Sequence, residues 1–60
     1  MMDDRILGLV RSTNLSISEA VDYVAVEKYG YSQTGWAVDR GVTQQSVSRN
    51  VANARSKLSE

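Results

Sequence analysis

The 60-residue chain contains no cysteine, no histidine and no proline. Without cysteine no disulfide framework can form, and without cysteine or histidine no zinc site can stabilise so short a chain. A domain of this length buries only about 60% of the surface that its unfolded form exposes, so one modest core is the limit. We therefore predict a single domain spanning residues 1–60, stabilised by packing, and a homodimer is an open alternative.

The same absences argue against catalysis. An enzyme needs an activated nucleophile or a tuned acid and base inside a pocket, and this chain lacks both reactive residue types and the length to enclose a substrate. Asp3 and Asp4 are adjacent at a terminus with no further ligands nearby, so a helix-start charge explains them better than a metal site. We expect a protein that is not an enzyme and uses neither a cofactor nor a metal.

A long apolar run is also missing from the start of the chain. Residues 1–10 carry two aspartates and no basic leader, so neither export nor membrane insertion is indicated. From this we expect a cytoplasmic protein with no membrane partner.

The chain has no net charge, because seven lysines and arginines balance seven aspartates and glutamates. The two parts of the chain differ, however. Residues 1–39 contain three basic and six acidic residues, whereas residues 40–60 contain four basic residues and one acidic residue. Such an asymmetry is expected where one element faces phosphates.

Apolar residues recur at helical spacing and never alternate strictly, which predicts an all-α fold. The predicted helices span about residues 3–11, 17–29, 33–40 and 44–58. Ser16 and Glu19 have the spacing of a capping box before the second helix, and Gly30 is suited to ending it. This helix has an apolar stripe and a face expected to be solvated: the stripe is Ile17, Ala20, Val21, Val24 and Ala25, and the solvated face is Glu19, Asp22 and Glu27.

The third and fourth helices have their own boundary signals. Ser32 and Thr43 can cap them, and Gly41 between them can adopt a positive φ. On the fourth helix a stripe should face the core: Val47, Val51, Ala54 and Leu58. The opposite half should face outward: Gln45, Ser48, Arg49, Ala52, Asn53 and Ser56. Residues 44–57 contain no acidic residue, and glutamine, arginine and asparagine are side chains that read base edges.

Two capped helices joined by a short glycine turn are typical of a helix-turn-helix. From Gly30 to Leu58 the sequence GYSQTGWAVDRGVTQQSVSRNVANARSKL resembles, without a gap, the region-four helix-turn-helix of bacterial sigma factors and related response-regulator DNA-binding domains. The matching positions are Gly30, Ser32, Ala37, Gly41, Val42, Val47, Val51, Ala54, Arg55 and Leu58. Gly35 and Trp36 depart from the family pattern, in which an acidic and a branched aliphatic residue are common. The run GVTQQSVSRNV is equally similar to the reading helix of small plasmid- and phage-control repressors.

The resemblance implies DNA binding, with contact to the transcription machinery as a further expectation. We predict a small bundle of about four helices containing a helix-turn-helix, acting on double-stranded DNA as a transcriptional regulator. The predicted base-reading residues are Gln44, Gln45, Ser48, Arg49 and Asn53. The predicted phosphate contacts are Ser32, Gln33, Arg40, Thr43, Ser46, Arg55 and Lys57.

Two other interpretations also fit parts of the sequence. A protein-interaction module could use the stripe of Val47, Val51, Ala54 and Leu58 as a helical seam, because its spacing is also heptad-like. The aromatic residues could form a stacking platform for single strands, but they lie on or beside the expected core faces, so packing explains them better: Tyr23, Tyr29, Tyr31 and Trp36.

Overall fold

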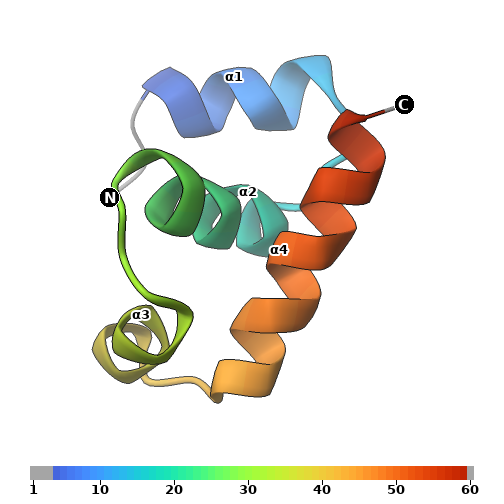
Figure 1. The fold of residues 1–60 in the computed structure, drawn as a ribbon. Coiled ribbons are helices and arrows are strands. Elements are labelled where there is room, and N and C mark those ends of the chain that lie inside the picture. The colour runs from blue at the N-terminus through green and yellow to red at the C-terminus, as the bar shows by residue number, and fades with distance from the viewer. Residues whose placement is uncertain (1–3, 60) are drawn as a thin grey trace.

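The structure is a computed structural model that describes residues 4–59, without the side chains at positions 5, 9 and 12. These residues form α1 (Asp4–Ser12), α2 (Ile17–Tyr23), a π-helical turn η1 (Val24–Lys28), α3 (Gln33–Arg40) and α4 (Gln44–Leu58), as Figure 1 shows. No strand occurs among them, so the all-α prediction of a small bundle is confirmed. The expected start of the first helix at residue 3 lies outside the described residues.

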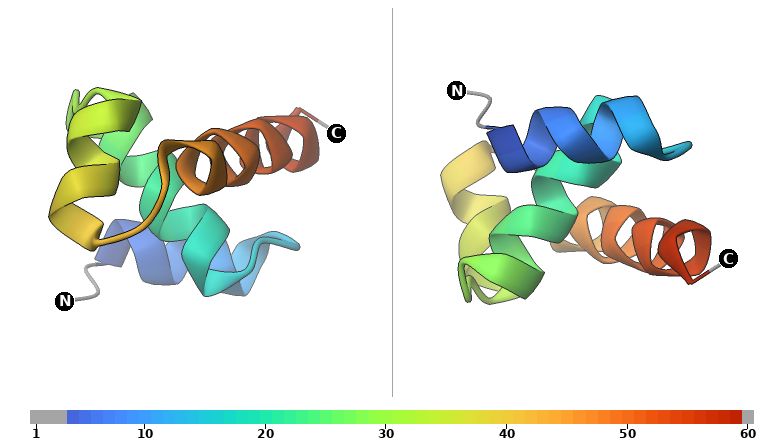
Figure 2. Two further views of the ribbon diagram at one scale, coloured as in Figure 1. Left: turned by 90° about the horizontal axis from the view of Figure 1, so that it is seen from below. Right: turned by 90° about the horizontal axis from the view of Figure 1, so that it is seen from above.

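Helix α2 lies at the centre of the bundle. Figures 1 and 2 show α1 on one side of α2 and α3 on the other, while α4 runs across both α2 and α3. The contacts agree with this arrangement, because α4 packs against α2 and α3, and α1 packs against α2. One side of α4 is therefore covered by the rest of the domain.

The predicted capping box at the start of α2 is confirmed. Ser16 Oγ accepts a hydrogen bond from the Glu19 N–H at 3.2 Å, and Glu19 Oε1 accepts one from the Ser16 N–H at 3.0 Å. The helix predicted over about residues 17–29 is present to Lys28, but at Val24 it changes from the α-helix α2 to the π-helical turn η1. There the Tyr29 N–H donates to the Val24 carbonyl five residues back at 3.0 Å. Such a wide turn rotates the residues that follow it, and Val26 packs against the cluster formed by α3 and α4.

The boundaries of α3 and α4 agree with the predicted ranges. Ser32 Oγ accepts from the Gly35 N–H at 2.9 Å, and Thr43 Oγ1 accepts from the Ser46 N–H at 3.1 Å. Gly41 has a φ of 74°, in the left-handed region. This conformation lets the N–H groups of Gly41 and Val42 turn back to the carbonyls of Val38 and Ala37, at 3.2 and 3.0 Å.

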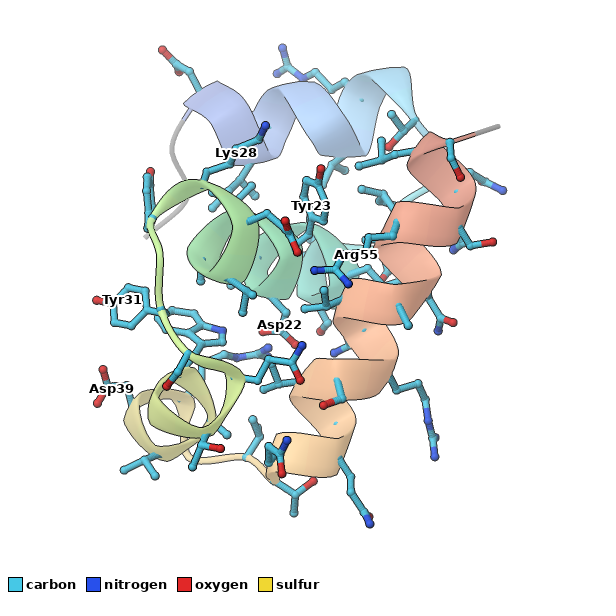
Figure 3. The ribbon with its side chains drawn as sticks, in the orientation of Figure 1. Asp22, Tyr23, Lys28, Tyr31, Asp39 and Arg55 are labelled. Carbon is cyan, nitrogen blue, oxygen red and sulfur yellow. The ribbon has the colours of Figure 1, made fainter. Side chains whose placement is uncertain are left out.

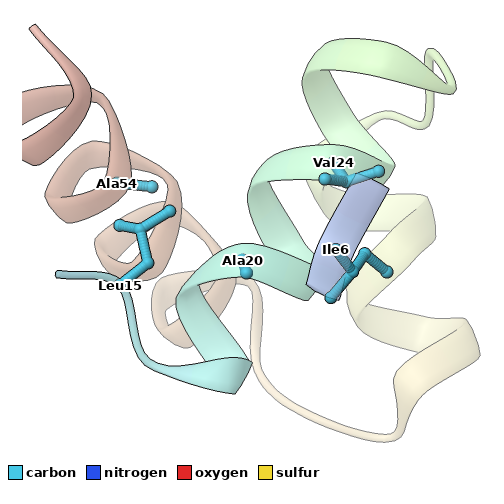
Figure 4. Packing of buried hydrophobic residues seen from close by; sticks show 5 residues of the cluster. All are labelled: Ile6, Leu15, Ala20, Val24 and Ala54. Atoms are coloured by element: carbon cyan, nitrogen blue, oxygen red, sulfur yellow. The ribbon is translucent and has the colours of Figure 1, made fainter. Parts of the chain in front are cut away.

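Two apolar clusters form the core, and both use α4. The first consists of Ile6, Leu15, Ala20, Val24 and Ala54 (Figure 4), and the second of Ala37, Val47 and Val51. The predicted inward stripe of α4 is confirmed, because Val47, Val51 and Ala54 are at most 1% exposed and Leu58 packs against the first cluster. Ile17 is 55% exposed, contrary to its predicted place in the core, because it is the first residue of α2 and precedes the covered turns. The residues that could have formed a helical seam with a partner protein, Val47, Val51 and Ala54, are thus covered by other helices of this chain.

A matched pair of glycine substitutions tests the turn between α3 and α4. Added Cβ atoms at Gly8 and Gly41 would both meet open space, but only Gly41 has a positive φ. We expect Gly41→Ala to lower the free energy of unfolding by about 1–2 kcal/mol, because an L-residue is strained in the left-handed region. Gly8→Ala, inside α1, should raise it by roughly 0.5–1 kcal/mol.

Urea denaturation followed by circular dichroism measures both changes. Equal effects of the two substitutions would contradict the left-handed turn at Gly41.

Candidate nucleic-acid interface

A buried carboxylate lies where α2, α3 and α4 meet. The side chain of Asp22 is fully buried, and Figure 3 shows it between the three helices. Trp36 Nε1–H donates to Asp22 Oδ1 at 2.8 Å, and Asn50 Nδ2 donates to Oδ2 at 2.7 Å. Arg40 Nη1 forms an ion pair with Oδ1. Asp22 therefore joins α2 to α3 twice and to α4 once.

The expectation that Glu19 and Asp22 belong to a solvated face is wrong. Asp22 is 0% exposed and Glu19 only 9% exposed, because both are covered by packing against α4 or α3. A charge can be buried when it is paired and hydrogen-bonded, and here the donors come from distant parts of the sequence. The indole of Trp36 supplies one of these donors.

The remaining basic residues near the end of the chain are also paired internally. Arg55 forms an ion pair with Glu27 of η1. Lys57 Nζ lies 2.8 Å from Glu19 Oε1 and donates to the Asn14 carbonyl at 3.1 Å. Three of the four cations in residues 40–60 thus bind carboxylates of α2 and η1. The charge asymmetry of the sequence is in large part an attraction between helices of this domain.

The other predicted phosphate contacts lie at the helix starts of α3 and α4. Ser32 and Thr43 use their side-chain oxygens as caps, and Thr43 Oγ1 also donates to Ser46 Oγ at 3.0 Å. Gln33, half-buried, accepts a hydrogen bond from the hydroxyl of Ser48. These polar groups are occupied within the chain, although Ser32, Thr43 and Ser46 remain exposed to solvent.

The side of α4 that faces away from the core carries most of the predicted base-reading residues. The residues of this side, which we call the outer face of α4, are all exposed: Gln45, Arg49, Ala52, Asn53 and Ser56. Gln44 is exposed beside them, and Ser48 is half-buried at their edge because of its bond to Gln33. At about 100° per residue, Gln45, Arg49, Ala52 and Ser56 fall within a narrow sector of the helix.

Arg49 differs from the other basic residues of residues 40–60. It is exposed, and no ion pair joins it to any residue between 4 and 59. The outer face of α4 therefore presents one unpaired positive charge among uncharged polar side chains. An isolated guanidinium of this kind can donate two parallel hydrogen bonds to a planar acceptor pair.

Sequence reasoning missed Asp22 and Asn50 as the residues that position α4. A signal for both is present in the helical spacing. Asn50 lies three residues after Val47 and four before Ala54, at the border of the apolar stripe of α4, and Asp22 falls between Ala25 and Val26 on a helical projection. A polar residue at the border of an apolar stripe indicates a buried hydrogen bond when a partner is available.

Comparison with known proteins finds no matching family model, no matching curated protein and no matching solved structure. None of the helices in residues 4–59 has the length and apolar character needed to cross a membrane.

Removing the Asp22 carboxylate tests its role in holding the three helices. Asp22→Ala leaves Trp36, Arg40 and Asn50 without their acceptor, and breaking such a network costs about 3 kcal/mol or more. The whole domain is expected to have roughly 3–9 kcal/mol of stability for its length. The variant should therefore unfold at a much lower temperature and a much lower urea concentration than the wild-type protein.

The control is Asp39→Ala, since Asp39 is exposed and has no ion pair with a described residue. It should change the free energy of unfolding by no more than about 0.5 kcal/mol. A native-like Asp22→Ala protein would show that the network is dispensable.

The pairing of Glu19 predicts a loss of stability in acid. The Lys57 ammonium, and then the backbone hydrogen bond from Ser16, hold the pKa of Glu19 below its ordinary value of 4.5. A lowered pKa in the folded state gives stability that is complete above pH 4.5 and is lost as the pH falls through the lowered value. Glu19→Gln should remove this part of the decline.

The measurement is the free energy of unfolding between neutral and acid pH for the wild-type protein and the variant. Lys57→Met should flatten the same region, because Lys57 is the largest cause of the shift. If the free energy of unfolding fell with pH in the same way for the wild-type protein and Glu19→Gln, Glu19 would not be the source of the acid instability.

Proposed function

We propose that this chain is a sequence-specific DNA-binding protein that inserts the outer face of α4 into the major groove and acts as a small transcriptional regulator. The observation that carries the proposal is the chemistry of that face. It is exposed, free of acidic residues, rich in amide and hydroxyl groups, and carries the unpaired Arg49. An ordinary solvated helix usually alternates acidic and basic side chains instead.

The shape of the domain supports this proposal. The 15 residues of α4 span about 22 Å, and a major groove about 12 Å wide admits a helix. The core covers only one side of α4, so its outer face can approach a duplex without a change in the fold. The glycine turn at Gly41 and the network of Asp22 fix the direction of α4 against α3. The resemblance of residues 30–58 to helix-turn-helix domains points the same way.

The individual side chains suit base recognition. A guanidinium such as that of Arg49 can bind the O6 and N7 acceptors of guanine, and the Gln45 amide matches the N6 and N7 groups of adenine. Ala52, between them and Ser56 along the face, permits close approach of the backbone and an apolar contact with a thymine methyl group. Base contacts, rather than phosphate contacts, thus form the larger part of the expected interface.

The electrostatics set the expected strength of binding. Among side chains that the structure describes, Arg11, Lys28 and Arg49 are the exposed cations without an ion pair, and only Arg49 lies on α4. Since counterion release scales with the number of phosphates neutralised, one domain should bind random duplex weakly and with a shallow salt dependence. Two copies on a near-palindromic site, with half-sites about 34–36 Å apart, would double the contacts. A cytoplasmic location and contact with the transcription machinery complete the proposal.

The test begins with selection of bound sequences from a random pool of duplexes, followed by titrations of the selected site and of random duplex. Arg49→Ala should weaken binding to the selected site by about 1–3 kcal/mol and relax preference at one base pair. Gln45→Ala should relax a neighbouring position. Arg11→Ala, on α1 and therefore not part of the outer face of α4, is the matched control and should leave the base preference unchanged.

If Arg49→Ala lowered the affinity for selected and random DNA equally, Arg49 would contact phosphate, and the assignment of the outer face of α4 to base recognition would be wrong. Absence of any duplex binding at low salt would overturn the proposed function.

A further inference from the structure

The ion pair between Arg55 and Glu27 differs from the other two ion pairs of the domain. Its side chains are 58% and 28% exposed, whereas the Asp22 carboxylate paired with Arg40 is fully buried and shared with two other donors. Glu19, the partner of Lys57, is also almost buried and belongs to the capping box. Exposed ion pairs contribute little to stability and are screened by salt. The Arg55 pair can therefore open without loss of the fold.

The position of Arg55 borders the outer face of α4. It follows Ala52 by three residues and Ser48 by seven, so the three side chains lie along one edge of the helix. In Figure 3 the guanidinium of Arg55 extends from α4 toward the segment that carries Glu27. The carboxylate of Glu27 thus binds Arg55 where a DNA phosphate could bind it, beside the surface proposed to enter the groove.

We propose that Glu27 is an internal competitor of DNA phosphate for Arg55. In the free domain Arg55 is held by Glu27, and on a duplex it exchanges this carboxylate for a phosphate oxygen pair. A guanidinium binds phosphate through two parallel hydrogen bonds, which favours the exchange once the phosphate is close. This inference rests on the proposed DNA binding and assigns a regulator to the same site.

The exchange has a defined effect on affinity. Because Glu27 must be displaced from Arg55 on every duplex, the competition weakens binding to selected and to random DNA by the same factor. Base contacts by Arg49 and Gln45 are unaffected, so their contribution decides which duplexes are bound at a given concentration. Glu27 therefore lowers the affinity for every duplex and leaves the base preference unchanged.

The test is a double-mutant cycle in which Glu27→Gln and Arg55→Gln are made singly and together. Glu27→Gln should tighten binding to selected and random duplex by about two- to fivefold at low salt, the range expected for an exposed ion pair. Arg55→Gln should weaken both and lower the salt slope by about one. In the Arg55→Gln background, Glu27→Gln should change the affinity for duplex no more than the loss of any other exposed negative charge does.

The matched control for net charge is Asp39→Asn, an exposed carboxylate that forms no ion pair with residues 4–59. The competition would be overturned if Asp39→Asn tightened duplex binding as much as Glu27→Gln does, or if Glu27→Gln kept its full effect in the Arg55→Gln background. Either result would mean that Glu27 acts on DNA by general charge repulsion. Circular dichroism of each variant confirms the fold.

The outcomes separate this inference from the proposed function. Duplex binding by the wild-type protein with no effect of Glu27→Gln refutes the competition alone. Failure of every variant to bind any duplex refutes both the proposed function and the competition. Duplex binding by the wild-type protein that Glu27→Gln tightens only while Arg55 is present supports both.

Discussion

The buried carboxylate of Asp22 is the interaction on which the arrangement of the helices depends. The apolar core consists largely of alanine and valine side chains, which allow close approach but do not fix one crossing angle. Hydrogen bonds are directional, and Asp22 accepts them from Trp36 of α3 and Asn50 of α4 while pairing with Arg40. A carboxylate in this place is tolerated only when each donor is present, so the network selects one geometry.

The same principle explains the charge distribution of the whole domain. The acidic residues of α2 and η1 face basic residues of α3 and α4, so three carboxylates meet three cations between helices. What remains on the outer face of α4 is uncharged and polar, with Arg49 as its unpaired cation among described residues. A surface of this kind depends on hydrogen-bond geometry more than on total charge, which suits selective recognition better than general attraction to a polyanion.

The two pairs that flank α4 have different consequences. Lys57 is bound by a carboxylate that also closes the α2 capping box, so its loss affects the start of a helix as well as the ion pair. Arg55 is bound by an exposed carboxylate on η1, and its release leaves caps and core intact. The π-helical turn contributes here, because it determines the direction in which Glu27 leaves the helix. The chemistry of the α4 surface is thus linked to a local irregularity in another element.

The sequence by itself determined the features that depend on near neighbours. Caps at Ser16, Ser32 and Thr43 require only a side-chain oxygen and an N–H three residues on, and the left-handed turn at Gly41 requires only the absence of a Cβ. The inward stripe and the exposed outer face of α4 follow from helical spacing for the same reason. Only the tertiary structure decided which charged side chains are buried and paired. Whether Asp22 is solvated or buried depends on donors 14, 18 and 28 residues away, and local periodicity carries no information about such distant partners.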